Sequence, residues 1–563
     1  MSSYKSGEAF IEILNAHGVD KVFVNPGFEY LDVLSSVAFA RTGGKKAPQL
    51  VLCLDESVAA AAAYGNYMVT GKPQAVLVHS EIGSLQLGAN LQNLQWGRVP
   101  ALIMAAYQDA DARRALWNGQ PHDQGGIVRN SVKYDRALRG DEDLHGAMAE
   151  AFRIACEAPA GPVYLSFPMS YLYKDIERRE ALPEKTAPLP AVDMGKLAEM
   201  AEILLAAKNP LLVSGHTGRH TPNVKAFTTL AETLGAMALT GYSWMNFPSN
   251  HPLCVGIEQI GGSRKLDAGY GEADAILAID YDMPYVGSAP PPCPSAKILH
   301  IDTDPLTQGR LLWGRGADIF MKADAAEAIP ALDSLLKEKM TGEKKAELAE
   351  RSKRIAAENE GARQKWHEDA RNQSCDDPIS ADYLCYCLNQ AIDEDTIFLN
   401  HTLSHCASVT EQIVRTKPGT WFGCPSGAIG WASGAALGAA SASPGKTVVA
   451  AMTDGGFVWG CPTSTFWTAS HYKFPFLAVI FNNNGYGAIR GPQQEMLDIP
   501  PDGQFASESA VDFQIDYALT AQGAGAFGRT VARPEDIPPA LEEALAAVRG
   551  GKPAVLNVHL AKK

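Results

Sequence analysis

The chain has 563 residues, a net charge of −14, and 46% hydrophobic and 20% charged residues. Because this length exceeds what one hydrophobic core supports, several domains of a soluble globular protein are expected. The negative charge argues against nucleic acid or an anionic membrane as the main partner. No apolar run is long enough to span a membrane and no secretory signal is visible, so a cytoplasmic protein is predicted. The 10 cysteines lack zinc-site spacing and are expected to be reduced thiols.

Residues 5–170 alternate short apolar runs with helical patterns. This alternation is typical of a parallel sheet covered by helices on both faces. A long helical pattern covers residues 57–69. The stretch 175–192 is rich in proline and charge, and we interpret it as a linker. The strands expected in this first block are residues 22–24, 50–54, 74–78, 101–105 and 163–167.

Two further blocks follow the same alternation. Residues 193–335 contain expected strands at 210–214, 275–280 and 297–301. A charged segment over 335–372 has alanine and leucine at helical spacing and predicts an exposed linking helix. The last block runs from residue 379 to the end. Its expected strands are residues 447–452, 476–481 and 554–559.

Polar residues follow two of these strands. Asp454 comes after the run 447–452 and is followed by two glycines, and Asn483 belongs to three successive asparagines after 476–481. Asp and Asn side-chain oxygens, with a backbone carbonyl and phosphate oxygens, suit Mg²⁺. The glycines let backbone N–H groups approach a diphosphate. The alternative is two ordinary strand-to-loop turns, but the combined spacing favours a site for magnesium and a diphosphate.

Glu56 lies where the expected strand 50–54 gives way to the helix 57–69. A carboxylate at this place can point into the crevice at the carboxyl end of a strand. The simpler interpretation is that glutamate favours a helix N-terminus. Beside the Asp454 motif we favour a catalytic carboxyl group, which must be buried and have a raised pKa.

Short motifs are spread over nearly the whole chain. They are Asn25-Pro26-Gly27, Glu56, Val78-His79-Ser80, Gly161-Pro162-Val163, Gly427-Ala428-Ile429-Gly430, Asp454-Gly455-Gly456, Asn482-Asn483 and Tyr486-Gly487-Ala488. Together they resemble the thiamine diphosphate-dependent decarboxylase and acetolactate synthase superfamily, most closely its benzoylformate decarboxylase-like members. The chain departs from the usual pattern at Thr453, where the family has glycine, and in a longer interval between Asp454 and Asn483.

The resemblance implies three doubly wound α/β domains. They are a pyrimidine-binding domain at 1–175, a middle domain at 193–335 and a diphosphate-binding domain at 379–563, with a linking helix in 336–378. The implied cofactors are thiamine diphosphate and Mg²⁺, held between the first domain of one subunit and the third domain of its partner. A homodimer is therefore the minimum, and a homotetramer is expected. Some relatives carry FAD or ADP in the middle domain, and this point stays open.

Carried over residue by residue, the resemblance assigns Glu56 to ring nitrogen N1′ of the pyrimidine. It assigns Mg²⁺ ligation to the side chains of Asp454 and Asn483 and to the carbonyl of Gly485. The remaining implied cofactor contacts are Gly455 and Gly456 along the diphosphate, Gly427 at the 4′-amino group, Ile429 beneath the cofactor and Thr402 near the diphosphate.

His79 ends the expected strand 74–78, where benzoylformate decarboxylase has a His-Ser pair. We therefore expect it to move protons on the substrate, the alternative being a core histidine. Phe28 stands where that family has a small hydroxyl residue, and residues 280–297 lack the family's second active-site histidine. Both changes argue against an aryl 2-keto acid. The other expected pocket residues are His122, Tyr285 and Trp459.

The resemblance predicts a carbon-carbon lyase that decarboxylates a 2-keto acid to an aldehyde without oxidation. An acetolactate synthase-like carboligase and a lyase of 2-hydroxy ketones or 2-hydroxyacyl compounds stay open, because the same catalytic residues serve all three. A non-catalytic member of the fold is disfavoured by the intact Glu56, Asp454 and Asn483. A flavin or NAD oxidoreductase is disfavoured because no GxGxxG motif opens a strand-helix unit.

Overall fold

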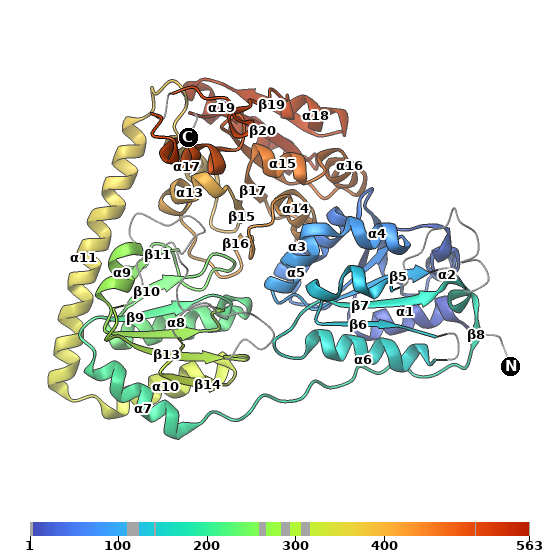
Figure 1. Ribbon diagram of the computed structural model, residues 1–563, viewed down its shortest axis with the longest axis horizontal. Coiled ribbons are helices and arrows are strands. Elements are labelled where there is room, and N and C mark those ends of the chain that lie inside the picture. The colour runs from blue at the N-terminus through green and yellow to red at the C-terminus, as the bar shows by residue number, and fades with distance from the viewer. Residues whose placement is uncertain are drawn as a thin grey trace.

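The computed structural model describes residues 4–107, 109, 123–139, 142–257, 266–282, 293–305, 316–500 and 503–561. These residues form three six-stranded sheets whose strand pairs are all parallel, each flanked by helices (Figure 1). The predicted α/β class with three parallel-sheet domains is confirmed. The three domains lie at the corners of a triangle in Figure 1, with the third domain at the top and the first at the right.

The first sheet has the strand order β3-β2-β4-β5-β7-β6. Strands β4 and β5 lie at its centre. Residues 74–78 of β4 and 101–106 of β5 are therefore buried on both faces of the sheet. Its strands are β2 (Lys21–Asn25), β3 (Gln49–Leu52), β4 (Gln74–Val78), β5 (Ala101–Tyr107), β6 (Tyr134–Ala137) and β7 (Val163–Pro168). Its helices are α1 (Ser6–Ala16), α2 (Leu31–Thr42), α3 (Glu56–Thr70), α4 (Ser80–Gln86), α5 (Gly88–Trp96) and α6 (Leu144–Cys156). A short antiparallel pair joins β1 (Tyr4–Lys5) to β8 (Asp175–Ile176).

The middle sheet has the order β11-β10-β9-β12-β13-β14. Residues 177–193 reach it without any helix or strand, along the lower edge of Figure 1. Its strands are β9 (Pro210–Ser214), β10 (Met237–Thr240), β11 (Cys254–Ile257), β12 (Ala275–Ile279), β13 (Lys297–Asp302) and β14 (Ile319–Lys322). Its helices are α7 (Met194–Ala206), α8 (Thr221–Leu234), α9 (Leu266–Glu272) and α10 (Ala325–Lys339).

The charged segment between the second and third domains forms a separate long helix, α11 (Gly342–Asn372). The prediction of one helix from residue 335 needs correction, because Thr341 caps a new helix through the N–H of Lys344 at 3.2 Å. One face of α11 is also buried. Its Arg351 is 8% exposed and donates to the carbonyl oxygens of Gly235 and Ala207 at 2.9 and 2.8 Å. These bonds fasten the helix to the middle domain.

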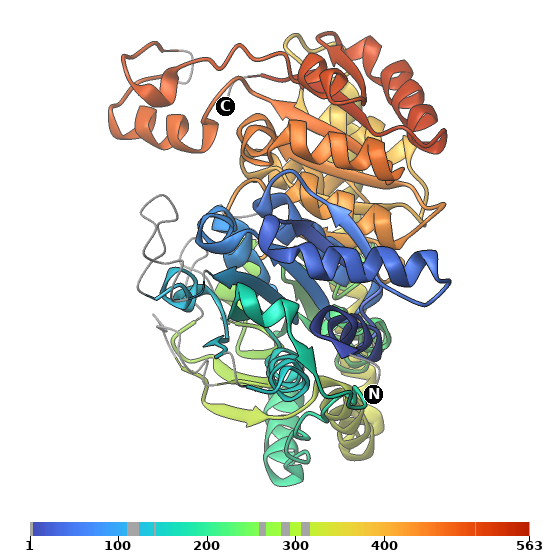
Figure 2. The ribbon, with the colours of Figure 1, turned by 90° about the vertical axis from the view of Figure 1, so that its right-hand side faces the viewer.

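The third sheet has the order β16-β15-β17-β18-β20-β19. The segment between β18 and α18 stands away from this sheet, and Figure 2 shows it as an orange-red lobe that includes α17. The strands are β15 (Ile397–His401), β16 (Trp421–Gly423), β17 (Val448–Thr453), β18 (Leu477–Asn482), β19 (Phe527–Val531) and β20 (Ala554–His559). The helices are α12 (Ala381–Ala391), α13 (Cys406–Gln412), α14 (Trp431–Ala442), α15 (Asp454–Trp459), α16 (Pro462–Tyr472), α17 (Gly487–Met496), α18 (Tyr517–Gly523) and α19 (Ile537–Arg549).

Candidate active site

The Asp454 motif lies where β17 meets α15, and the expected turn is in fact the first turn of a short helix. The hydroxyl of Thr453 accepts a hydrogen bond from the N–H of Gly456 at 2.9 Å. Asp454 Oδ1 accepts from the N–H of Gly455 at 2.7 Å. Thr453, which departs from the family pattern, is therefore the N-cap of α15. A threonine just before a helix start is the usual signal for this role, although the sequence reasoning did not use it.

The three asparagines after β18 divide into different tasks. Asn482 donates to Asn557 Oδ1 at 2.9 Å inside the core, and Asn484 Oδ1 accepts from the N–H of Gln514 at 3.2 Å. The side chain of Asn483 makes no hydrogen bond to any described residue and is 4% exposed. Its amide oxygen is thus available to a ligand.

A hydrogen bond joins the two strand ends. Asp454 Oδ2 accepts from the N–H of Gly485 at 2.9 Å, and Gly485 has φ +144°, a backbone conformation that favours glycine. Burial raises the pKa of Asp454, while the N–H donors of Gly485, Gly455 and Asn484 lower it. The carboxylate is 1% exposed. A cation beside it would offset the cost of burying this charge.

The described residues contain no cluster of three or more His, Cys, Asp or Glu side chains that could bind a metal ion. A cation at Asp454 would therefore rely on one carboxylate, the amide oxygen of Asn483, a backbone carbonyl and oxygens from its ligand. The carbonyl of Gly485 accepts from Gly487 N–H at 3.0 Å and keeps a second lone pair. This oxygen-only set fits Mg²⁺ bound to a diphosphate.

Glu56 is the first residue of α3. Residues 53–55 separate it from Leu52, the last residue of β3. Its neighbour Asp55 is the N-cap and accepts from the N–H of Ser57 at 2.8 Å, so Asp55 rather than Glu56 satisfies the helix end. Glu56 is 5% exposed, and its carboxylate has no hydrogen-bond partner in the described part of the chain. It packs against Gly83 of α4, where a Cβ would lie 2.6 Å from Glu56 Oε1. A buried carboxylate without a partner fits a group that a ligand completes.

His79 lies between β4 and α4, at the carboxyl edge of the first sheet. Its side chain is 37% exposed, so it is not a core histidine. Nδ1 is bonded to Glu29 Oε1 at 2.8 Å. Glu29 lies in a short 3-10 helix (Phe28–Tyr30) and was not singled out from the sequence, because no local pattern marks its contact with residue 79. The neighbouring Phe28 is 47% exposed.

The remaining predicted residues of the third domain differ in exposure. Gly427 is exposed and Ile429 partly exposed, so both can meet a ligand. Trp459 is 56% exposed, and its backbone packs on Gly430, where a Cβ would lie 2.6 Å from the Trp459 carbonyl oxygen. Thr402 is fully buried, and its hydroxyl donates to Asn400 Oδ1 at 2.9 Å. His122 and Tyr285 lie outside the described residues.

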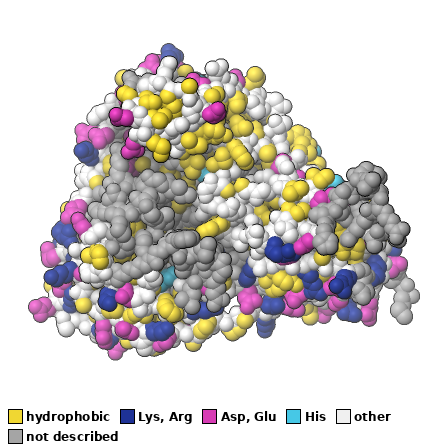
Figure 3. Space-filling view, in the orientation of Figure 1, with side chains coloured by type: hydrophobic (Ala, Val, Ile, Leu, Met, Phe, Trp, Pro, Cys, Tyr) yellow, Lys and Arg dark blue, Asp and Glu magenta, His cyan; other side chains and the backbone are white. Residues whose placement is uncertain are grey.

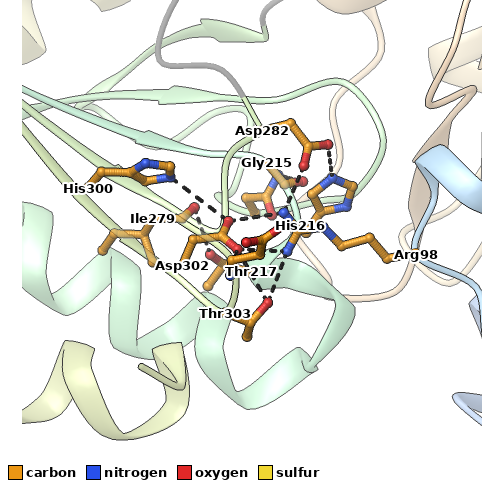
Figure 4. Close-up of polar contacts among 11 residues, drawn as sticks. Arg98, Gly215, His216, Thr217, Ile279, Asp282, His300, Asp302 and Thr303 are labelled. Atoms are coloured by element: carbon orange, nitrogen blue, oxygen red, sulfur yellow. Dashed lines mark hydrogen bonds and ion pairs between the residues drawn. The ribbon is translucent and has the colours of Figure 1, made fainter. Parts of the chain in front are cut away.

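The carboxyl edge of the middle sheet holds a buried arginine from the first domain (Figure 4). Arg98 follows α5 and is 2% exposed. Its two terminal nitrogens bind the two oxygens of Asp302 at 3.0 and 3.1 Å, and Nη2 also binds Asp282 Oδ1 at 2.7 Å. Asp282 in turn contacts His216 Nε2 at 3.0 Å. Burial and the nearby charge of Asp302 raise the pKa of Asp280 to about 7.

This edge contains the switch point between β9 and β12, where doubly wound sheets bind nucleotides. In nucleotide-binding sheets an acidic residue after a strand holds the ribose, and here Asp302 is taken by Arg98. The turn after β9 is also filled. A Cβ on Gly218 would lie 2.1 Å from the Met245 carbonyl oxygen, and one on Gly215 would lie 2.8 Å from the Tyr281 ring. In the described part of this crevice, the Asp302 carboxylate is thus already bound by Arg98.

Three family models match the chain in order. They describe the N-terminal thiamine pyrophosphate-binding domain at residues 4–127, the central domain at 197–332 and the C-terminal thiamine pyrophosphate-binding domain at 404–558. The chain belongs to the thiamine pyrophosphate enzyme family. The resemblance inferred from the motifs is thereby confirmed.

Curated relatives match over nearly the full length. The chain is 27% identical to a sulfoacetaldehyde acetyltransferase from Castellaniella defragrans, with 96% of this chain and 90% of the relative covered. It is 26% identical to a benzoylformate decarboxylase from Pseudomonas aeruginosa, with 96% of both covered. It is 25% identical to the large subunit of acetolactate synthase isozyme 3 from Escherichia coli, with 99% and 95% covered.

Solved structures share the fold. A 4-hydroxybenzoylformate decarboxylase from Rhodococcus jostii superposes with a TM-score of 0.80 at 24% identity, covering 100% of both chains. A benzoylformate decarboxylase from Polynucleobacter necessarius gives 0.79 at 20% identity, covering 100% of this chain and 99% of the other. Among the described residues, no helix combines the length and apolar character that crossing a membrane requires.

Proposed function

We propose that this protein is a thiamine diphosphate- and Mg²⁺-dependent lyase that decarboxylates a 2-keto acid to an aldehyde without oxidation. The observation that carries the proposal is the buried Glu56 carboxylate without a protein partner, on a chain whose third domain presents Asp454 and Asn483 together. When bound, thiamine diphosphate supplies an electron sink for the bond next to a carbonyl.

Glu56 would hold a proton at pyrimidine nitrogen N1′. A carboxyl group bonded to a ring nitrogen can share its proton with that nitrogen. Asp55 leaves it free for this task by capping α3 itself. Gly83 lets the α4 backbone approach the carboxylate. In this proposal Glu56 packs against Gly83 and meets the cofactor through its carboxylate.

The third domain would hold the charged end of the cofactor. Asp454, Asn483 and the carbonyl of Gly485 would bind Mg²⁺, and Gly455 and Gly456 would lie along the diphosphate. Support comes from the bond between Asp454 and Gly485, which brings the two strand ends together before any ligand binds. The other proposed contacts are Gly427 at the 4′-amino group, Ile429 beneath the cofactor and Thr402 near the diphosphate.

His79 would move protons on the substrate. Its position beside Glu56 supports this role, because both follow parallel strands of the first sheet at the same edge. Phe28 and Trp459 are exposed enough to line a substrate pocket. We keep His122 and Tyr285 as proposed pocket residues from the sequence alone.

An acyl-transferring or carboligating reaction is the second candidate. The relatives include an acetyltransferase and acetolactate synthases at identities close to that of the decarboxylase. The exposed ring of Phe28 also stands where a small hydroxyl residue is expected in benzoylformate decarboxylases. A bulky apolar group there removes one anchor for a substrate carboxylate.

Product analysis separates these reactions. Protein loaded with thiamine diphosphate and Mg²⁺ would be given aryl and aliphatic 2-keto acids, with and without an acceptor aldehyde. We expect carbon dioxide and aldehyde in equal amounts without the acceptor. A hydroxy ketone released together with carbon dioxide, with no free aldehyde formed from the 2-keto acid, would identify a carboligase. Cleavage of 2-hydroxy carbonyl compounds alone would identify the lyase alternative. Turnover that does not depend on both cofactors would overturn the proposal.

We also propose a homodimer at minimum, and a homotetramer as the expected assembly. No described contact within the chain joins Glu56 to Asp454. Hydrophobic side chains gather over the third domain on the face shown in Figure 3. The most exposed apolar side chains of α4, α15 and α17 are Ile82, Leu85, Val458, Trp459, Ile489 and Met496. A second copy covering them would bring Glu56 of one subunit to Asp454 of the other.

Co-expression of two inactive variants tests this arrangement. In a mixed dimer of Glu56→Gln and Asp454→Ala chains, a site shared between subunits would be intact once. Random pairing would then restore about a quarter of wild-type turnover. If each active site were built within one chain, every site would carry one of the two substitutions, and the mixture would stay inactive.

A further inference from the structure

A buried carboxylate holds one face of His79. Glu29 is 2% exposed, and its Oε1 lies 2.8 Å from His79 Nδ1. The imidazole itself is 37% exposed. Since Nδ1 faces the carboxylate, Nε2 is the nitrogen that can meet a ligand. This is the geometry in which a carboxylate selects one imidazole tautomer by keeping the proton on Nδ1.

The pair depends on a glycine. A Cβ on Gly27 would lie 2.0 Å from His79 Nδ1 and 2.2 Å from Glu29 Oε2. Both distances are too short for any side chain, so only glycine allows the contact. The Asn-Pro-Gly motif that carried part of the family resemblance therefore has a local physical task in this chain, which is to make room for the Glu29–His79 bond.

Rigid neighbours fix both partners. Tyr30 follows Glu29, and its hydroxyl lies 3.0 Å from the carbonyl oxygens of Val78 and Met104. It also accepts from the N–H of Ala106 at 3.0 Å. Val78 is the residue before His79. One buried hydroxyl thus ties the segment that carries Glu29 to the strand end that carries His79, which limits the geometries the pair can adopt.

The charged groups that face His79 are all acidic. The hydrogen bond to Glu29 raises the pKa of His79, burial lowers it, and the charges of Glu29, Glu56 and Glu81 raise it further. The net direction is upward. The protonated imidazole therefore persists to higher pH than in a free histidine, and the Glu29 carboxylate compensates its charge.

We propose that Glu29 is the positioning residue for His79, keeping a proton on Nδ1 and presenting Nε2 to the substrate. The proposal rests on the proposed function, in which His79 moves a proton. When Nε2 takes up a proton, the carboxylate stabilises the imidazolium; when Nε2 gives it up, Nδ1–H stays bonded to Glu29. Proton exchange is thus confined to the nitrogen that faces the pocket.

The Glu29→Gln variant removes the charge while keeping the size of the side chain. The pKa of His79 can be measured without any turnover, from exchange of the histidine C2 proton with deuterated water, followed by mass spectrometry across a pH series. We expect it to fall by about one unit or more in Glu29→Gln. Glu81→Gln is the matched control, because Glu81 acts on His79 through space only, and its effect should be smaller.

Turnover then separates the proposed action of Glu29 on His79 from the proposed role of His79 in the reaction. We expect kcat of Glu29→Gln at neutral pH to fall roughly 10-fold, as for other residues that orient a functional histidine. The limb of the pH–rate profile that is due to His79 should move to lower pH, by as much as the His79 pKa measured by proton exchange falls. If the pKa of His79 falls but turnover is unchanged, Glu29 does act on His79, but His79 takes no part in the reaction. An unchanged pKa would overturn the proposal for Glu29.

A second variant covers a folding failure. Gly27→Ala keeps both partners and places a methyl group between them. It should lower the pKa of His79 in the same direction as Glu29→Gln. Circular dichroism and the oligomeric state would be recorded for each variant. If Gly27→Ala folds and the His79 pKa stays at its wild-type value, the positioning role fails by this route as well.

Discussion

Gly65 of α3 lies directly on the backbone of Ala435 in α14, so closely that a Cβ on the glycine would lie 1.8 Å from the Ala435 carbonyl oxygen. The contact is mutual, because a Cβ on Gly438 would lie 1.9 Å from the carbonyl oxygen of Ala62. Small residues at this crossing let the first and third domains pack helix on helix. The helix that begins with Glu56 is thereby fixed to the domain that carries Asp454.

We therefore expect Gly65→Ala to destabilise the protein by about 1–3 kcal/mol, because the two helices must move apart. Gly361→Ala is the control. Gly361 lies in α11 with open space around it, so an added methyl group should raise helix propensity and stability by roughly 0.5–1 kcal/mol. Urea unfolding of both variants measures this. Equal effects of the two substitutions would contradict the close-packing argument.

Glu56→Gln should retain thiamine diphosphate but lose turnover by at least ~100-fold, since an amide cannot exchange a proton with N1′. Asp55→Asn is the matched control, because Asp55 caps α3 next door and has no proposed catalytic task. Steady-state rates with the best 2-keto acid and calorimetric cofactor titration give the comparison. Glu56→Gln at near wild-type rate would remove this residue from the reaction.

Loss of Mg²⁺, or of its proposed ligand Asp454, should weaken the binding of thiamine diphosphate. Asp454→Ala is expected to abolish the Mg²⁺-dependent part of thiamine diphosphate affinity, because Asp454 supplies the carboxylate of the proposed ligand set. Metal-stripped wild-type protein should show the same weak binding until Mg²⁺ is restored. Calorimetry with and without a chelator tests this. A variant with unchanged affinity and metal dependence would show that Asp454 is not the ligand.

Breaking the Arg98 cluster should be costly. Arg98→Gln leaves Asp302 buried at 1% exposure without its partner, and a loss of roughly 3–5 kcal/mol is expected for a buried ion pair of this kind. Arg129→Gln, which breaks exposed ion pairs, should change stability little. Denaturant unfolding measures both variants.

The same cluster predicts that the purified wild-type protein has no flavin absorbance and does not bind ADP, because Arg98 occupies the carboxylate that a ribose would need. A stoichiometric flavin in the protein as isolated would show that the crevice opens.

His401 should make the protein sensitive to acid. It is 2% exposed, its ring nitrogens have no hydrogen-bond partner among the described residues, and burial lowers its pKa to about 4. Below pH 6.5, the ordinary pKa of histidine, His401 is protonated in the unfolded chain but stays neutral in the folded protein. The free energy of unfolding therefore falls until about pH 4. Between pH 7 and 5 this amounts to about 2 kcal/mol.

His401→Leu should remove this part of the pH dependence. Unfolding in urea at pH 7 and pH 5 gives the slope for each protein. A variant that loses as much stability as the wild type over this range would show that His401 is protonated in the folded state.

Much of the candidate site could be predicted because its signals are local. The predicted strand 554–559 coincides with β20, and the apolar runs before Asp454 and Asn483 correspond to β17 and β18 within one residue at each end. The α11 boundary was missed because charged residues continue on both sides of Thr341, and the charge pattern does not show the cap that begins a new helix. Periodicity does not register a cap.

The sequence by itself determined the class of protein. Its alternating apolar runs dictate parallel sheets, and its glycines, asparagines and Asp454 mark the strand ends where we propose that the cofactor binds. Tertiary structure alone decided which polar groups meet: Glu29 with His79, separated by 50 residues, and Arg98 with Asp302, separated by 204. Local propensity acts over a few residues, whereas these pairings arise when separate strands and domains pack and leave charges to be compensated inside the protein.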